Sequence, residues 1–258
     1  MNILDEIAEK TRRRIAMEKQ EMPLDEIRKK GQVTKPGRFY QALKQDGMSY
    51  ICEIKKASPS KGIIAEEFPY IEIAKDYEAA GASAISCLTE PEYFLGSNEI
   101  LGEVAKHVTI PILKKDFVVD PYMIYQAAYY GASAVLLICK ILTEEELKEY
   151  LELAKQLGLD ALVEAHNADE IRKALHCGAR IIGVNNRNLE DFSVNTENAM
   201  ALREFVSEEI VFVSESGIKT REDIVRLEEA KVDAVLIGET MMRSRDKAAK
   251  LRELKGIK

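Results

Sequence analysis

The phrase "AAGASAISCL" (residues 79–88) recurs along this chain and indicates its fold. The related phrases are "YYGASAVLLI" (129–138), "HCGARIIGVN" (176–185) and "EAKVDAVLIG" (229–238). In each, the end of a helix leads through a turn into a buried strand. The turn residues fall at positions 81, 131, 178 and 231, which are steps of 50, 47 and 53 residues. Each step has room for two β–α units, so the phrase marks every second strand of a longer alternation.

Apolar, β-branched runs bounded by turn residues occur eight times. They span residues 49–55, 82–88, 110–116, 133–139, 160–165, 180–185, 209–215 and 233–238. Helical segments separate them, and Thr143 with Glu146 and Asn167 with Glu170 have the spacing of capping boxes. Continuous buried strands that alternate with helices predict a parallel sheet, and the repeat favours an α/β fold closed as a (β/α)8 TIM barrel. The alternative, an open doubly wound sheet, would normally carry a Gly-rich loop after its first strand, and "KKASPSKG" (55–62) does not match one.

The chain is expected to form a single domain, with a helical extension over residues 1–48 and the barrel over residues 49–258. Apolar residues at helical spacing predict an amphipathic helix over residues 3–15, and two shorter helices are expected at 23–31 and 38–45. The extension is not needed to close the barrel. We therefore favour its interpretation as a plug over one end of the barrel over a direct part in chemistry.

Composition limits the kinds of partner. Of the 258 residues, 46% are hydrophobic and 31% are charged, the balance of a soluble globular protein. A net charge of −7 argues against a nucleic-acid surface, so an anionic ligand has to be held by a few local cations and backbone amides. No apolar run approaches the roughly 18 residues of a membrane span, and the N-terminus lacks a secretory apolar region. We expect a cytoplasmic protein that binds neither nucleic acid nor membrane.

The cysteines and histidines do not indicate a metal centre. Four cysteines occur without a C-x-x-C pair, which is typical of reduced core cysteines in the cytosol. His107, His166 and His176 show no metal-ligand spacing and are expected in ordinary surface or loop roles. The sequence therefore predicts no metal site.

Charged and amide side chains fall at the C-terminal ends of the predicted strands, after apolar positions. They are Glu53, Lys55, Lys115, Glu164, Asn185 and Glu215. Because side chains alternate along a strand, Lys115 shares a side with Phe117, and Asn185 shares one with Arg187. In a barrel these positions converge at the C-terminal mouth, where such enzymes keep their active sites. Internal Lys–Glu pairs are poor stabilisers, so a catalytic site explains them better than a structural plug.

An anion site is expected beside the last two strands. Gly217 follows the seventh strand and Gly238 follows the eighth. Glycines let backbone N–H groups approach a ligand closely, and barrels commonly hold phosphate at this place. Lys55 would add a positive charge from the first strand, which neighbours the eighth once the barrel closes.

Ordered motifs along nearly the whole chain resemble those of indole-3-glycerol-phosphate synthase. They are "EIKKASPSKG" (53–62), "LTEPEYFLGS" (88–97), "PILKKDFVVDPYMIYQA" (111–127), "LLICKILTEEEL" (136–147), "LVEAHNADE" (162–170), "IGVNNRNLEDF" (182–192) and "VSESGI" (213–218). The resemblance implies a lyase of tryptophan biosynthesis. Its substrate would be the phosphorylated small molecule 1-(2-carboxyphenylamino)-1-deoxyribulose 5-phosphate, which undergoes ring closure, decarboxylation and dehydration without metal or organic cofactor. Other enzymes of the pathway are candidate partners.

By this resemblance Lys115 is the general acid for ring closure and Glu164 the general base. Lys55 would bind phosphate and substrate and is a second candidate proton donor, and the sequence does not separate the roles of the two lysines. Glu53 would pair with a lysine and tune it. The residues expected to hold substrate hydroxyls and developing charge are Asn185, Glu215 and Ser216. Phe117 would pack on the aromatic ring of the substrate, and Ser58 and Arg187 are expected as partners of the carboxylates at the mouth or of the carboxylate of the substrate.

Two positions depart from the family pattern. Glu239 stands after Gly238 where a small hydroxyl residue of the phosphate site is usual, so its carboxylate has to point away from the phosphate. Leu95 stands where family members often carry a polar residue. Two other readings remain open at this point. One is another phosphate-binding barrel such as phosphoribosylanthranilate isomerase, whose chemistry calls for a Cys/Asp pair, and the other is a barrel that only binds or assembles.

Overall fold

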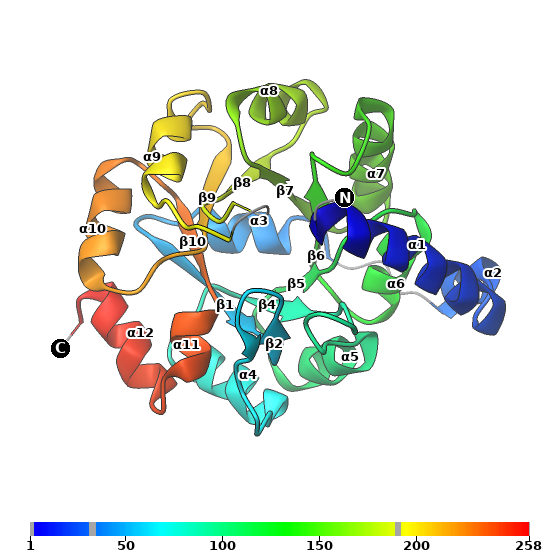
Figure 1. Cartoon of the computed structure of the whole chain (residues 1–258), viewed down its shortest axis with the longest axis horizontal. Coiled ribbons are helices and arrows are strands. Elements are labelled where there is room, and N and C mark those ends of the chain that lie inside the picture. The colour runs from blue at the N-terminus through cyan, green and yellow to red at the C-terminus, as the bar shows by residue number, and fades with distance from the viewer. Residues whose placement is uncertain (1–2, 31–34, 189–191, 258) are drawn as a thin grey trace.

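The computed structural model describes residues 3–30, 35–188 and 192–257. Eight parallel strands close into a barrel in the order β1-β10-β9-β8-β7-β6-β5-β4, and helices surround it (Figure 1). The strands are β1 (Ser49–Ile54), β4 (Ala84–Leu88), β5 (Ile112–Lys115), β6 (Ala134–Ile138), β7 (Asp160–Ala165), β8 (Ile181–Asn185), β9 (Val211–Glu215) and β10 (Ala234–Ile237). The predicted (β/α)8 barrel is confirmed, and each predicted strand is found within two residues of its expected bounds.

The outer helices follow the strands in chain order. They are α4 (Tyr70–Ala79), α5 (Asn98–His107), α6 (Tyr122–Tyr129), α7 (Glu144–Gln156), α8 (Ala168–His176), α9 (Glu197–Arg203), α10 (Arg221–Glu229), α11 (Glu239–Arg243) and α12 (Lys247–Lys255). The capping box at α7 is confirmed, because the Thr143 hydroxyl accepts from Glu146 N and the Glu146 carboxylate accepts from Thr143 N. The box at α8 forms only in half. Asn167 Oδ1 accepts from Glu170 N at 2.9 Å, but the Glu170 carboxylate bonds the backbone N–H of His166 instead of that of Asn167.

The barrel interior is filled by apolar side chains and closed at its N-terminal end by the extension. Helix α3 (Arg38–Leu43) places Phe39 and Leu43, both 0% exposed, against interior residues such as Ile51 and Val211. The backbone N–H of Tyr40 donates to Oδ2 of Asp160, the first residue of β7, at 2.9 Å. Helix α3 therefore plugs the N-terminal end of the barrel.

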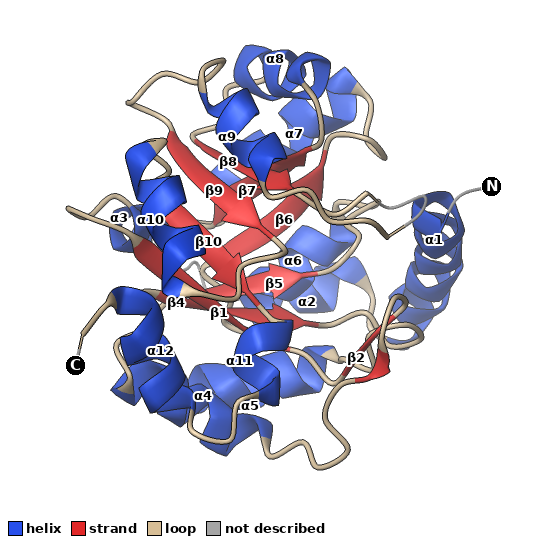
Figure 2. Cartoon of the chain, turned by 60° about the vertical axis from the view of Figure 1, so that its left-hand side comes forward, coloured by secondary structure: helices blue, strands red, loops and turns tan. Residues whose placement is uncertain are grey.

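The extension also covers the opposite end. Helix α1 (Ile3–Glu21) buries the apolar stripe that includes Leu4, Ile7 and Ile15. Its Arg14 bonds residues that directly follow β4 and β5, so α1 lies at the C-terminal mouth, and Figure 2 shows α1 and α3 on opposite sides of the barrel. The helix α2 (Leu24–Lys30) packs on α6. The three helices expected in the extension are found, and they cover both ends of the barrel, α3 the N-terminal end and α1 the C-terminal mouth.

The loop after β1 contains a feature that was not predicted. A two-stranded antiparallel hairpin pairs β2 (Ala57–Ser58) with β3 (Gly62–Ile63). It belongs to the segment "ASPSKG" and brings Ser58 to the mouth of the barrel. Among the described residues, no helix is long and apolar enough to cross a membrane.

Candidate active site at the barrel mouth

A cavity of about 610 Å³ lies at the C-terminal ends of the strands. All thirteen site residues named from the sequence line it. They are Glu53, Lys55, Ser58, Lys115, Phe117, Glu164, Asn185, Arg187, Glu215, Ser216, Gly217, Gly238 and Glu239. The structure thus brings together side chains that are up to 186 positions apart, from 53 to 239. Of the motif "IGVNNRNLEDF", residues 189–191 lie outside the described part of the chain.

Lys115 stands at the centre of the charged groups. Its Nζ donates to Oε2 of Glu215 at 3.1 Å and lies 3.6 Å from Oε2 of Glu164. Burial lowers the pKa of Lys115, but the carboxylates of Glu215, Glu164 and Glu53 together outweigh it, so the pKa is raised above its ordinary value. The ammonium group therefore keeps its proton at neutral pH, so the side chain is present in the form that has a proton to give.

At Glu215, in contrast to Lys115, the effect of burial on the pKa outweighs the attraction of the neighbouring opposite charge. Its side chain is buried, and Oε1 has no hydrogen-bond partner among the described residues. Burial raises its pKa to about 7, opposed by the ammonium of Lys115 and reinforced by the neighbouring charge of Glu164. Gly183 makes room for this carboxylate, because a Cβ there would lie 2.3 Å from Glu215 Oε1. Glu215 is therefore poised to change protonation state near neutral pH.

Glu53 and Lys55 form a second pair on the first strand and just after it. Lys55 Nζ donates to Glu53 Oε1 at 2.5 Å, and the Ser86 hydroxyl donates to Oε2 at 3.4 Å. Burial raises the pKa of Glu53, but Lys55 and Lys115 outweigh it and the net shift is downward. A Cβ at position 238 would lie 2.3 Å from Glu53 Oε1 and 2.8 Å from Lys55 Nζ. A side chain at position 238 would therefore displace the Glu53–Lys55 ion pair.

Asn185 and Ser216 connect the ends of β8 and β9. The Ser216 hydroxyl donates to Asn185 Oδ1 at 3.0 Å, and Asn185 Nδ2 lies 3.4 Å from Glu164 Oε1. Arg187 N also donates to Asn185 Oδ1, and the Arg187 guanidinium donates to the carbonyl of Phe192 at 3.1 Å. Ser216 has a φ of 70°, a conformation that usually costs a non-glycine residue about 1–3 kcal/mol and that concentrates at functional sites.

The rim near β9 and β10 is richer in cations than the sequence analysis anticipated. Glu239 Oε1 accepts from Arg243 Nε at 3.0 Å and lies 3.9 Å from Lys61 Nζ. Both cations line the cavity. These two cations therefore partly neutralise the carboxylate of Glu239, which stands where the family usually has a small hydroxyl residue. The i,i+4 spacing of Glu239 and Arg243 is a signal from which the pair was predictable.

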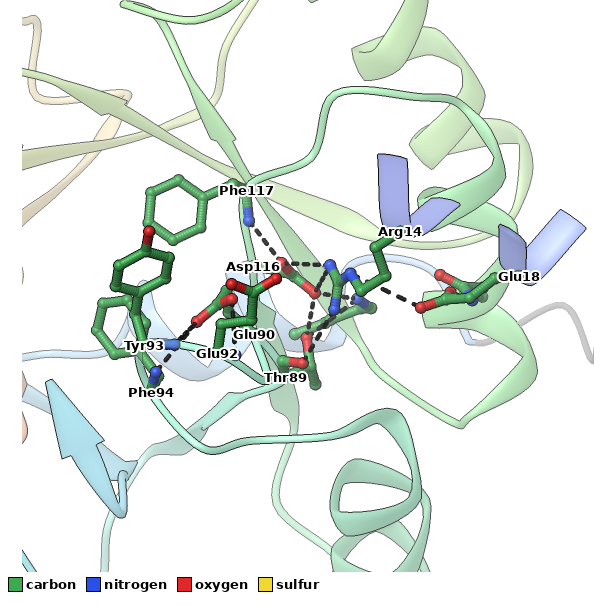
Figure 3. Close-up of polar contacts among 11 residues, drawn as sticks. Arg14, Glu18, Thr89, Glu90, Glu92, Tyr93, Phe94, Asp116 and Phe117 are labelled. Carbon is green, nitrogen blue, oxygen red and sulfur yellow. Dashed lines mark hydrogen bonds and ion pairs between the residues drawn. The ribbon is translucent and has the colours of Figure 1, made fainter. Parts of the chain in front are cut away.

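A second aromatic ring was also missed. Phe94 lines the cavity, and its ring centroid lies 6.0 Å from that of Phe117. The loop that carries it is organised by the Glu90 carboxylate, which accepts the backbone N–H groups of Glu92, Tyr93 and Phe94 at 2.7–3.0 Å (Figure 3). Leu95, the other departure from the family pattern, is 39% exposed and is not among the residues that line the cavity.

A buried ion cluster fixes the backbone on both sides of Lys115 (Figure 3). Asp116 accepts from Arg14 Nη2 at 3.0 and 3.1 Å, from Lys114 Nζ at 3.0 Å and from the Thr89 hydroxyl at 2.7 Å. Burial raises the pKa of Asp116, but Lys114 and Arg14 outweigh it and lower the pKa well below its usual range. The carboxylate is thus held ionised, and α1 is tied to the strand end that carries Lys115.

The fold and this cavity define a (β/α)8-barrel enzyme whose mouth holds lysines and carboxylates suited to acid–base chemistry. The family model for indole-3-glycerol phosphate synthase matches residues 4–254, and the chain belongs to this family. It is accordingly a carbon–carbon lyase of tryptophan biosynthesis that couples ring closure to decarboxylation.

Similar proteins span nearly the whole chain. An indole-3-glycerol phosphate synthase from Ruminiclostridium cellulolyticum is 54% identical over 98% of this chain and 99% of its own length. One from Leuconostoc mesenteroides is 49% identical over 99% of this chain and 100% of its own. Among solved structures, KGPDC from Streptococcus mutans has a TM-score of 0.64 at 12% identity, covering 82% of this chain and 97% of that one. A tryptophan synthase alpha-subunit from Pyrococcus furiosus has a TM-score of 0.62 at 14% identity, covering 81% and 98%. These structural likenesses concern the fold alone.

Proposed function

We propose that the cavity converts 1-(2-carboxyphenylamino)-1-deoxyribulose 5-phosphate to indole-3-glycerol phosphate, CO2 and water, with Lys115 as general acid and Glu164 as general base. The observation that carries the proposal is the position of the Lys115 ammonium, 3.1 Å from Glu215 and 3.6 Å from Glu164. An acid and a base are thereby held at one point of the same cavity, within reach of one small substrate.

The reaction needs these groups in sequence. The ring carbon that bears the carboxylate attacks the ketone carbon, a C–C bond forms, and the ketone oxygen takes a proton from Lys115. The C–CO2 bond then breaks, and its electron pair restores the aromatic ring. In the last step Glu164 removes a proton from the carbon next to nitrogen, and the hydroxyl group leaves with a proton as water. Lys55 supplies that proton, or Lys115 does so after it has taken up a new proton from solvent, since both lie at the mouth.

The remaining groups bind and orient the substrate. Phosphate would lie against the loops of Gly217 and Gly238 and the backbone of Glu239, opposite Lys55. The aromatic ring would pack on Phe117. The groups proposed for substrate hydroxyls, the carboxylate and developing charge are Asn185, Glu215, Ser216, Ser58 and Arg187. Glu53 would hold Lys55 in place through the 2.5 Å ion pair.

The experiment mixes the purified chain with this substrate, without added metal, and follows indole fluorescence. The chain has no Trp, so an indole product stands out against tyrosine emission. Lys115→Ala and Glu164→Gln are each expected to lower turnover by about 10²-fold or more, the usual contribution of a general acid or base. Wild-type turnover in either variant would remove that residue from its role. Lys106→Ala, at an exposed pair with Glu103, is the matched control and should leave turnover unchanged.

We further propose a cytoplasmic location. Its support is that Cys52, Cys87, Cys139 and Cys177 are buried free thiols, which fit a reducing compartment.

Enzymes that make the substrate or use the indole product are the proposed partners. Co-purification with such an enzyme would test this, and a chain that elutes alone from a cell extract would count against it.

A further inference from the structure

His166 lies directly behind the proposed base. It follows β7 two residues after Glu164, and its side chain is 16% exposed. Its Nε2 lies 3.4 Å from Glu164 Oε1 on one side, and its Nδ1 lies 3.1 Å from Glu170 Oε2 on the other. His166 is not among the residues that line the cavity, and its nearest contact with the site is Glu164.

The start of α8 is arranged around this imidazole. In a complete capping box the Glu170 carboxylate would accept the backbone N–H of Asn167. Here Glu170 Oε2 instead accepts the backbone N–H of His166 at 2.8 Å and contacts its ring, while Oε1 accepts from the Asn167 side chain at 3.1 Å. The carboxylate therefore holds both the backbone and the ring of His166, and the position of the imidazole is fixed from behind.

Nε2 of His166 faces the carboxylate of Glu164. The atom is buried and has no aligned hydrogen bond within the described ranges, and the polar atom nearby is Glu164 Oε1 at 3.4 Å. A buried donor left without a partner typically costs about 1–3 kcal/mol. Catalytic hydrogen bonds are often long in the unliganded enzyme and tighten when substrate binds. The geometry thus indicates a contact that is completed when Glu164 meets its substrate.

We propose that His166 is a positioning residue of the active site, which is anchored by Glu170 and donates a hydrogen bond from its Nε2–H to Glu164, so that the base is held in its orientation and its negative charge is paired during the dehydration step. This inference rests on the proposed role of Glu164. It adds a member to the site on the outer side of β7, where the sequence analysis expected an ordinary loop histidine.

The charges around the imidazole agree with a cationic ring. Carboxylates face it from three elements: Glu164 on β7, Glu170 on α8 and Glu215 on β9. Burial lowers the pKa of His166, but the hydrogen bond to Glu170 and the charge of Glu164 outweigh it, and the pKa is raised above its ordinary value. The cation Lys115 faces Glu164 from the opposite side. Opposite charges therefore alternate from Glu170 to Lys115 through His166 and Glu164.

The test compares His166→Gln with the wild type in steady-state kinetics between pH 5 and 9. Removing a cation beside a base makes the base easier to protonate, so the acid limb of kcat/KM should move up by about one pH unit. At pH 7 kcat should fall about tenfold, the size of one charge-assisted hydrogen bond, with KM changed by less than twofold. A shifted acid limb is a readout that a merely structural loss would not produce.

His176→Gln is the matched control. His176 on α8 also pairs with a carboxylate, with its Nε2 3.2 Å from Glu144 Oε1, but its side chain is 75% exposed and lies away from the cavity. Its profile should coincide with that of the wild type. Glu170→Gln keeps the histidine and loosens its anchor, so it should move the acid limb in the same direction by a smaller amount. This variant tests the proposal even if His166→Gln folds poorly.

The outcomes separate the inference from the reaction it serves. Wild-type turnover with an unshifted acid limb in both His166→Gln and Glu170→Gln would overturn the role of His166 and leave the proposed function in place. A lowered unfolding temperature with an unshifted acid limb would also overturn it, as a structural role only. No turnover by the wild type would overturn the proposed function and the inference with it.

Discussion

Lys114 and Lys115 are neighbours in the chain, yet the barrel gives them opposite environments. Lys114 is 0% exposed and faces away from the cavity, where it bonds Asp116 and Thr89, and burial lowers its pKa. Lys115 faces the mouth, where three carboxylates raise its pKa. Because side chains alternate along a strand, one register step would exchange the two lysines. The ion pair of Lys114 with Asp116 opposes that step, so the position of the proposed acid is fixed from outside the cavity.

Glu215 makes the stability of the protein depend on pH. Its pKa is raised from 4.5 to about 7 by burial, so the folded state binds a proton that the unfolded state releases between these values. Stability contributed by this group is complete below pH 4.5 and is lost as pH rises to 7, with a slope of at most about 1.4 kcal/mol per pH unit. Glu215→Gln carries no titrating group. The free energy of unfolding of the variant, taken relative to that of the wild type, should therefore be higher at pH 8 than at pH 5.

Urea unfolding of both proteins at pH 5 and pH 8 measures this difference. Glu204→Gln on the surface after α9 removes the same charge at an exposed position and serves as control. A difference between Glu215→Gln and wild type that is equal at the two pH values would show that Glu215 does not titrate in this window.

Glu239 offers a test of the anion site. Its carboxylate accepts a hydrogen bond from Arg243 Nε at 3.0 Å. It also adds a negative charge to the rim where phosphate is proposed to bind. Glu239→Ser should release that cation and lower KM about twofold to fivefold, the size of one exposed ion pair. The gain should shrink as salt is raised, because exposed charges are screened.

Steady-state kinetics at low and high ionic strength measures this effect. Glu229→Ser on α10 removes an equal charge from an exposed position and should leave KM unchanged. If Glu239→Ser raises KM, the carboxylate contributes to binding, and the proposed phosphate contact at this position is wrong.

The strand-end residues that face the cavity were predictable from the sequence, whereas Phe94 on the cavity wall and the residues behind the cavity were not. Glu53, Lys115 and Glu164 stand at the ends of apolar runs, and strand alternation with barrel closure is enough to bring them together. His166 and Arg14 act through residues that they contact only after folding, from a loop and from the extension. No local pattern marks such contacts, because a buried partner far along the chain leaves no spacing to recognise.

Among the helices and strands, too, those with a local sequence pattern were predictable and those that depend on contacts formed after folding were not. Strands were located within two residues because each is a continuous buried run, and α7 was located by its complete capping box. The hairpin of β2 and β3 spans only two residues per strand, too short for any periodicity to show. The amphipathic pattern of α1 predicts a helix with one buried face, but it does not say which end of the barrel that face covers.

Arg14 tests what α1 does for the site. It reaches from α1 to Asp116 and to the carbonyl of Thr89, and thereby ties the helix to the ends of two strands. Arg14→Ala leaves the buried Asp116 with Lys114 as its remaining cation, so we expect a loss of about 2–3 kcal/mol in the free energy of unfolding, the size of a hydrogen bond to a charged group. KM should rise as well, because Phe117 follows Asp116 directly and its N–H is held by that carboxylate.

Urea unfolding and steady-state kinetics check both effects. Arg12→Ala is the control on the same helix, where the guanidinium is 51% exposed and lies 4.0 Å from Glu9. An equal loss in the two variants would mean that Arg14 acts as an ordinary surface charge. A loss of stability without a rise in KM would separate α1 from the cavity.

At the scale of the whole molecule, the extension and the barrel share one core. Helix α3 fills the N-terminal end of the barrel, α1 lies against the C-terminal mouth, and Ile3, Leu4 and Ile7 line the cavity itself. We therefore propose that residues 1–258 unfold as one domain, although the repeat that builds the barrel begins only at residue 49. If the extension and the barrel were independent units, the chain would show two unfolding transitions.

Phe39 distinguishes these alternatives. It is 0% exposed and packs against interior residues of the barrel, so Phe39→Ala should cost about 3–5 kcal/mol through lost burial and an unfilled cavity. In a single domain this loss lowers the urea midpoint of the entire transition, with an unchanged slope, and far-UV and near-UV circular dichroism report the same curve. Phe205→Ala, at a ring that is 42% exposed, should shift the midpoint much less. If Phe39→Ala creates an early partial transition and leaves the main midpoint in place, the extension is a separate unit, and its contacts with the barrel are too weak to couple the two.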